Sequence, residues 1–114
     1  MGLPNGANAV VDIENLRDYC LSAQHPEGRH KARVFLAVLG LTSVDAAKLR
    51  EILLAAAVVN NEVSIIDADK YGCRYAMDTI VTLGSREAFV RSAWIIKTGE
   101  DFPRLVSCYV LRGA

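Results

Sequence analysis

The densest group of side chains that could do chemistry lies between residues 25 and 33, in the segment His-Pro-Glu-Gly-Arg-His-Lys-Ala-Arg. It contains both histidines of the chain, His25 and His30, together with Arg29, Lys31 and Arg33. Imidazole can accept or donate a proton near neutral pH, and lysine and arginine bind phosphate and stabilise charge that develops on it. Because a helix is predicted to start here, its first N–H groups would also favour an anion. The segment therefore combines acid–base groups with an anion-binding surface.

The same segment also has a purely structural interpretation. A charged connection between helices is commonly solvated surface, on which His25 could hydrogen-bond a neighbour and Arg33 could face water. Pro26 and Gly28 bracket the cluster and indicate a backbone of fixed shape, which favours a function without establishing one.

A second group of polar residues falls on the last two predicted strands. It consists of Arg91, Lys97, Arg104, Ser107 and Tyr109. Arg91 lies among apolar neighbours, so its charge must reach an ion-pair partner, a ligand or the edge of the sheet. Asp78 is the candidate for a structural pair. Ser107 and Tyr109 share one face of a strand, where they would either line a cleft or face water.

Charge and motifs argue against several classes of protein. The 114 residues carry 13 lysines and arginines against 13 acidic residues, so the net charge gives no overall attraction to nucleic acid or to an anionic membrane. No Walker, Rossmann, HExxH or GxSxG motif is present, no apolar run is long enough for a membrane span, and no N-terminal secretion signal is expected. The cysteines, Cys20, Cys73 and Cys108, show no CxxC spacing, which predicts buried free thiols in a reducing, cytoplasmic compartment and no metal or other cofactor.

Hydrophobic periodicity predicts one α+β domain over residues 1–114, with about three N-terminal helices packed on an antiparallel sheet of three to four strands. An irregular arm over 1–8 precedes a helical half over 12–57, and alternation typical of a sheet covers 62–111. The predicted helices are 13–21, 32–39 and 43–57. The predicted strands are 63–66, 74–81, 87–97 and 105–111. Trp94 is expected in the core, between helices and sheet.

The chain resembles a bacterial domain-of-unknown-function family over nearly its whole length. The most specific part of the resemblance is His25-Pro26-x-Gly28-Arg29-x-Lys31-Ala32-x-x-Phe35. The other matching segments are Leu3-Pro4-Asn5, Ala9-Val10, Tyr19-Cys20-Leu21, Leu39-Gly40, Tyr75, 90–95 and Pro103-Arg104-Leu105-Val106-Ser107-x-Tyr109.

More distantly, helices followed by an antiparallel sheet are similar to the barnase/EndoU/colicin/RelE-like ribonuclease toxins, which cleave RNA without a metal. That likeness implies a small metal-independent endoribonuclease, the toxin of a bacterial toxin–antitoxin pair, with RNA as its substrate. It also implies a cognate antitoxin or immunity protein that covers the cleft. The implied catalytic residues are His25, His30, Lys31 and Arg91, with either histidine as acid or base. The implied substrate-binding residues are Arg29, Arg104, Ser107 and Tyr109.

A non-catalytic binding module, antitoxin-like, immunity-like or accessory, fits the zero net charge and the two histidines as well. No membrane partner is expected, and the sequence leaves a homodimer open. The ribonuclease hypothesis depends on one spatial requirement. The connection between the first two helices must bring its imidazoles to the guanidinium of Arg91.

Overall fold

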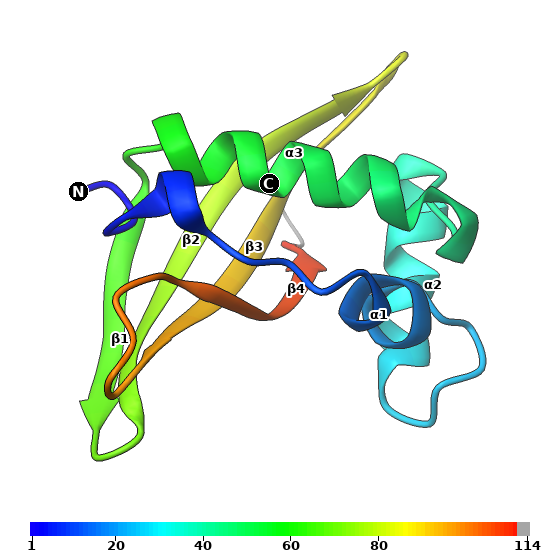
Figure 1. Cartoon of the computed structure of the whole chain (residues 1–114). Helices are drawn as coiled ribbons and strands as arrows, with labels where there is room; N and C mark the ends of the chain where they lie inside the picture. The colour runs from blue at the N-terminus through cyan, green and yellow to red at the C-terminus, as the bar shows by residue number, and fades with distance from the viewer. Residues whose placement is uncertain (112–114) are drawn as a thin grey trace.

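Helices fill the N-terminal half of the chain and strands fill the C-terminal half, as the change in hydrophobic period predicts. The computed structural model describes residues 1–111 (Figure 1). Its helical segments are η1 (Gly6–Asn8), α1 (Ile13–Asn15), η2 (Leu16–Cys20), α2 (Gly28–Leu39), η3 (Ser43–Asp45) and α3 (Ala46–Val59). Its strands are β1 (Val63–Asp69), β2 (Gly72–Leu83), β3 (Arg86–Lys97) and β4 (Arg104–Val110). The strands form one antiparallel sheet in the order β1-β2-β3-β4, which confirms the α+β prediction.

The first two helical segments differ in detail from the prediction. The first begins at Ile13 as expected, but η2 is a π-helical turn, closed by a hydrogen bond of 2.8 Å from the Leu21 N–H to the Leu16 carbonyl. The second helix begins at Gly28 instead of after residue 31. The cationic residues that follow Gly28 are therefore helical residues, held at fixed spacing, and do not belong to a loop.

Gly28 starts α2 because of packing, and not because its backbone is unusual. A Cβ atom at this position would lie 2.0 Å from the Tyr19 carbonyl oxygen and 2.7 Å from the carbonyl carbon. Only a residue without a side chain lets the start of α2 approach η2 so closely. This contact fixes α2 against the preceding turn.

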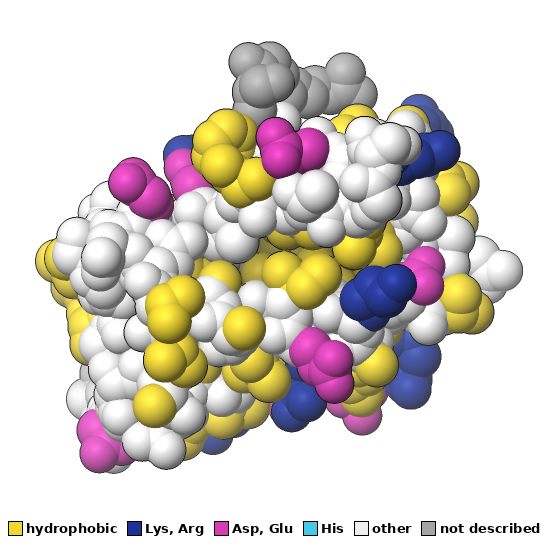
Figure 2. Space-filling view, turned by 90° about the horizontal axis from the view of Figure 1, so that it is seen from above, with side chains coloured by type: hydrophobic (Ala, Val, Ile, Leu, Met, Phe, Trp, Pro, Cys, Tyr) yellow, Lys and Arg dark blue, Asp and Glu magenta, His cyan; other side chains and the backbone are white. Residues whose placement is uncertain are grey.

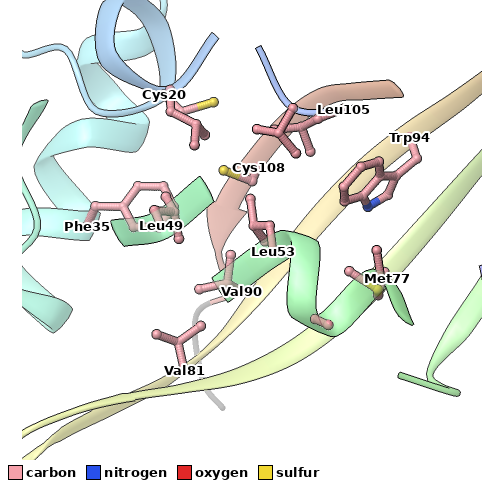
Figure 3. Packing of buried hydrophobic residues seen from close by; sticks show 14 of the residues in the cluster. Cys20, Phe35, Leu49, Leu53, Met77, Val81, Val90, Trp94, Leu105 and Cys108 are labelled. Carbon is pink, nitrogen blue, oxygen red and sulfur yellow. The ribbon is translucent and has the colours of Figure 1, made fainter. Parts of the chain in front are cut away.

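The hydrophobic core lies between the helices and one face of the sheet. Figure 3 shows Leu49 and Leu53 of α3 in one cluster with Val90 and Trp94 of β3, and the Trp94 side chain is fully buried, as predicted. The other face of β3 is not covered: Phe89 is 37% exposed and Arg91 is partly exposed. The sequence reads β3 as apolar on both faces and therefore central, but its second face remains open to solvent.

The two edges of the sheet differ in how far other parts of the chain cover them. Along β4, Val10 forms a parallel bridge with Arg104, and the Asn15 side chain donates to the carbonyls of Leu105 (3.3 Å) and Val106 (2.9 Å). The apolar segment Ala9-Val10-Val11, for which the sequence allows a short edge strand or a docked plug, thus contributes a single bridge. On β1, every residue after Val63 is exposed. The N-terminal segment and α1 therefore protect the β4 edge, beside which the candidate site lies.

The boundaries of the third helical segment follow the predicted signals. Thr42 and Asp45 form a reciprocal cap, in which the Asp45 carboxylate accepts the Thr42 N–H at 3.0 Å. Val38 of α2 is 37% exposed, although its spacing from Phe35 and Leu39 predicts a place on the buried stripe. No helix within residues 1–111 is long and apolar enough to cross a membrane.

Replacing Ser92 by alanine is expected to destabilise the core. The Ser92 hydroxyl is buried, accepts the Trp94 indole N–H at 2.8 Å and donates to the Met77 carbonyl at 3.2 Å. Without it, the indole N–H would remain buried without an acceptor, so Ser92→Ala should lower the free energy of unfolding by about 2 kcal/mol in urea titrations. Ser64→Ala, on the exposed part of β1, is the matched control and should change it by less than about 0.5 kcal/mol. Equal effects of the two substitutions would contradict this assignment.

Candidate functional site

A groove of about 480 Å³ lies between α2 and the end of β4. Its walls come from both elements: His30, Lys31 and Val34 from α2, and Tyr109, Val110 and Leu111 from the end of the sheet. The groove thus brings together an imidazole, an ammonium and a phenol from two segments nearly 80 residues apart in sequence. Each of these three residues is among the candidates that the sequence predicts.

Lys31 is held at one side of this groove by the preceding turn. Its Nζ donates to the Tyr19 Oη at 2.9 Å and lies 4.9 Å from the centre of the Tyr19 ring. The Tyr19 hydroxyl raises the pKa of Lys31, and the thiols of Cys20 and Cys108 act in the same direction. Lys31 is therefore an ammonium group across the physiological range.

His30 differs from His25 in what holds its ring. Within residues 1–111 the His30 side chain makes no hydrogen bond, and the residue is exposed at the rim of the groove. Both nitrogens of its ring are therefore accessible to a ligand. This is the state that a group exchanging protons with a bound molecule requires.

His25 instead caps the start of α2. Its Nδ1 accepts the backbone N–H groups of Glu27 (3.0 Å) and Gly28 (2.9 Å), and its carbonyl accepts the Arg29 N–H at 3.0 Å. Its ring packs edge-on against Tyr19, with 4.8 Å between the ring centres. Because it accepts two N–H groups at a helix start, His25 satisfies donors that would otherwise lack partners. It does not line the groove between α2 and β4.

Arg91 lies on the open face of the sheet, in register with Tyr109. It forms a two-pronged ion pair with Asp78, with Nε–Oδ1 and Nη2–Oδ2 distances of 2.7 and 2.8 Å. Asp78 raises the pKa of Arg91 with a smaller contribution from the Tyr109 hydroxyl, and Arg91 lowers the pKa of Asp78. Arg91 thus neighbours the groove residue Tyr109 on the adjacent strand, while two of its guanidinium N–H groups donate to Asp78.

The other three candidates lie outside this groove. Arg29 is exposed and borders a second hollow of about 330 Å³ on the opposite flank of α2, together with Arg33. Arg104 begins β4, about 16 Å along the strand from Tyr109, and forms a two-pronged pair with Glu100 at 2.9 and 3.0 Å. The Ser107 hydroxyl lies 3.9 Å from the Cys20 sulfur, at the contact between η2 and β4.

Sequence reasoning missed a cluster of thiols beneath the groove. Cys20 and Cys108 are both buried, and Figure 3 shows their sulfurs turned toward one another from η2 and β4. The Cys108 thiol lowers the pKa of Cys20 to about 7, helped by Ser107 and Lys31, whereas Cys20 raises the pKa of Cys108. Arg17, the cation in the same turn as Cys20, pairs with Asp18, whereas Lys31 comes near Cys20 only in the folded chain. Cys73 is partly exposed, in contrast to its expected burial.

The cations of α2 are separated from the acidic residues of the chain. The helix contains Arg29, Lys31 and Arg33 but no carboxylate, and none of the three forms an ion pair within residues 1–111. The ion pairs of this part of the chain are Arg17–Asp18, Arg74–Asp67, Arg74–Asp69, Arg91–Asp78 and Arg104–Glu100. Figure 2 shows cationic and anionic side chains interspersed on the face seen from above. A net charge of zero therefore coexists with a local positive surface on α2.

No group of three or more His, Cys, Asp or Glu side chains within residues 1–111 is placed to hold a metal ion. The titratable residues that line the groove are an imidazole (His30), an ammonium (Lys31) and a phenol (Tyr109).

Comparisons with known proteins place the chain in a family and identify a similar fold. The family described as a domain of unknown function, DUF6883, matches residues 2–112. No curated protein matches the sequence. The structure is similar to a chain of a contact-dependent growth inhibition toxin–immunity protein complex from Klebsiella pneumoniae 342, with a TM-score of 0.65. The match has 17% sequence identity and covers 90% of this chain and 99% of that chain, so it shows a shared fold.

The capping role of His25 predicts a difference between two substitutions. His25→Ala removes the acceptor for two N–H groups and should lower the free energy of unfolding by about 1 kcal/mol. His25→Asn should retain most of the stability, because an asparagine side-chain oxygen is a good acceptor at a helix start. His30→Ala is the matched control on the same segment and should change stability by less than about 0.5 kcal/mol. Thermal and urea unfolding measure all three, and equal losses for the alanine and asparagine variants at position 25 would refute the cap.

Proposed function

The chain belongs to the DUF6883 family, and we propose that it is a small metal-independent endoribonuclease, the toxin of a bacterial toxin–antitoxin or toxin–immunity pair. One observation carries the proposal. His30, Lys31 and Tyr109 converge on a single groove, and within residues 1–111 Lys31 forms no ion pair with an acidic residue. An unengaged imidazole next to an ammonium and a phenol is a set of groups that RNA cleavage by the ribose 2′-hydroxyl needs.

In the proposed reaction, the neutral His30 imidazole accepts the proton of a ribose 2′-hydroxyl. The 2′-oxygen forms a bond to the adjacent phosphorus as the bond from phosphorus to the 5′-oxygen breaks. This leaves a 2′,3′-cyclic phosphate on one product and a 5′-hydroxyl on the other. Tyr109 supplies the hydroxyl in the groove that can donate a proton to the leaving oxygen.

Lys31 and Arg91 have different parts in this reaction. The Lys31 ammonium lines the groove and stabilises the negative charge that develops on the phosphate oxygens. Arg91 acts through Tyr109, which faces it across the β3–β4 ladder and contributes to its raised pKa. Since Asp78 occupies two of its five N–H donors, Arg91 supports the phenol and is not the main phosphate ligand.

The substrate is held by the exposed side of α2. Arg29 and Arg33 lie one helical turn apart on the flank of α2 opposite the groove, and the helix brings no carboxylate that would repel a phosphate backbone. Such a row of cations attracts RNA locally although the whole protein is neutral. The similarity to a chain of a toxin–immunity complex supports a role within such a pair.

The alternative function is a non-catalytic binding module, such as an antitoxin or immunity protein. The observation that favours it is the pairing of cations on the open sheet face, where Asp67, Asp69 and Asp78 neutralise Arg74 and Arg91. A surface of matched charges is suited to a protein partner more than to a polyanion. In that case the cations of α2 would contact an acidic surface of the partner.

The ribonuclease proposal predicts cleavage of total RNA by the purified chain and loss of cleavage on mutation of the groove. His30→Ala should lower the rate at least about 100-fold, the contribution typical of general base catalysis. Lys31→Ala should reduce the rate by a similar factor, because a charge-stabilising donor is lost. His25→Asn and Lys70→Ala are matched controls, a histidine outside the groove and an exposed lysine at the β1–β2 turn. Both should retain wild-type activity, and product ends should be 2′,3′-cyclic phosphates.

Expression in bacteria separates the two functions if cleavage requires a cellular complex. Induction of the chain alone should arrest growth, His30→Ala should abolish the arrest without unfolding the protein, and a cognate neighbouring gene product should relieve it. A folded wild-type chain that leaves both RNA and growth intact would decide for the binding module.

A further inference from the structure

Tyr19 is the residue beside the groove that sequence reasoning did not single out as functional. It belongs to the π-helical turn η2, a type of backbone that is rare and occurs often at functional sites. Its phenol oxygen accepts a hydrogen bond of 2.9 Å from the Lys31 ammonium, which lines the groove. The contact joins Tyr19, which precedes α2 in the sequence, to Lys31 on the first turn of α2.

We propose that Tyr19 is a positioning residue for Lys31, holding the ammonium where a phosphate in the α2–β4 groove would meet it. This inference rests on the proposed ribonuclease function of the same groove. Tyr19 does not itself line the groove, so it acts through Lys31 and not on the substrate.

Three separate contacts fix the Tyr19 ring and carbonyl. The carbonyl lies so close to Gly28 that no side chain fits there, and the ring packs edge-on against His25. The π-helical turn, closed between Leu16 and Leu21, sets the direction of the side chain. A phenol held on both sides in this way is a rigid acceptor.

Lys31 needs such an acceptor because its side chain is long. The flexible four-carbon side chain of lysine allows its ammonium many positions at similar energy. An exposed lysine loses this conformational freedom only when a partner holds it. The Tyr19 oxygen, together with the nearby ring, selects one of these positions. Because the ammonium is already fixed before substrate binds, the reaction does not have to lose the entropy of ordering the lysine side chain.

Other titratable groups also face Lys31. From η2 these are Tyr19 and Cys20, from β4 they are Cys108 and Tyr109, and His30 lies next to it on α2. Tyr19 makes the largest contribution to the raised pKa of Lys31, and the two thiols contribute less. Removal of the Tyr19 hydroxyl should therefore allow Lys31 to lose its proton at lower pH than in the wild type.

Tyr19→Phe tests the inference, because it deletes only the hydroxyl and keeps the ring against His25 and the carbonyl against Gly28. The variant should unfold at the wild-type temperature, while kcat for RNA cleavage falls about tenfold, the loss typical of one charge-assisted hydrogen bond. KM should change little, and the alkaline limb of the rate profile should move to lower pH. NMR titration of the Lys31 side chain, assigned with Lys31→Ala, should show its pKa lowered in the same variant.

Tyr71→Phe is the matched control. Lys70 lies 5.2 Å from the centre of the Tyr71 ring, so this pair repeats the contact of a lysine with a tyrosine ring at the β1–β2 turn. Removal of the Tyr71 hydroxyl should leave kcat, the pH profile and the pKa of Lys31 unchanged.

The outcomes separate this inference from the proposed function. If wild-type protein cleaves RNA but Tyr19→Phe keeps the full kcat and pH profile, Tyr19 does not position Lys31 for catalysis and the ribonuclease assignment stands. If wild-type protein cleaves no RNA, the proposed function fails, and the NMR titration alone decides whether Tyr19 holds the ammonium. An unchanged Lys31 pKa in Tyr19→Phe would overturn the inference in either case.

Discussion

The site depends on one close contact, that between Gly28 and the backbone of Tyr19. This approach, too close for any Cβ atom, sets where α2 begins and how it lies against η2. Since α2 carries His30 and Lys31, the contact also sets the distance of both from the end of β4. Any side chain at position 28 would push the helix away from the turn. The positions of the groove residues on α2 therefore follow from the absence of a single methyl group.

A second constraint is electrostatic and explains how a chain of zero net charge keeps unpaired cations on α2. Three cations of the sheet, Arg74, Arg91 and Arg104, each contact a carboxylate. The helix α2 has no carboxylate in its sequence, so its cations remain available. These exposed pairs contribute little to stability, because solvent screens charges at the surface. Within residues 1–111 these pairs leave the cations of α2 without an acidic partner.

The sequence predicts the fold well and the site only in part. The change from helical to alternating period locates the sheet, and turn residues place its strand ends within a few positions. Gly28 was read as part of a loop, since glycine disfavours helices, but here its packing against Tyr19 outweighs that preference. Composition identifies His25 and His30 together and cannot separate them. Only the cap, a contact of one imidazole with two backbone N–H groups, distinguishes the histidine held by the fold from the one that is free.

Tyr19 illustrates why a contact between distant side chains escapes sequence analysis. In an α-helix its position would be one of several on an apolar stripe, and nothing in the spacing points to Lys31. The π-helical turn inserts an extra residue into the ladder, which rotates the following side chains relative to an α-helix. Periodicity assumes 3.6 residues per turn, so it cannot register such a rotation. The fold places the phenol by a local departure from the regular period.

The fold alone does not decide between a catalytic and a non-catalytic function. A fold similar to that of a chain in a toxin–immunity complex is compatible with either side of such a complex, because both sides must present complementary surfaces. Complementarity alone requires charge and shape, which the cations of α2 could supply to an acidic protein. It does not require an imidazole without a partner next to a fixed ammonium. A binding surface would gain from tying down His30, as the chain ties down His25, since a free side chain loses entropy on association. Within residues 1–111 the side chain of the histidine at the groove makes no hydrogen bond, and the proposed ribonuclease function rests on this observation.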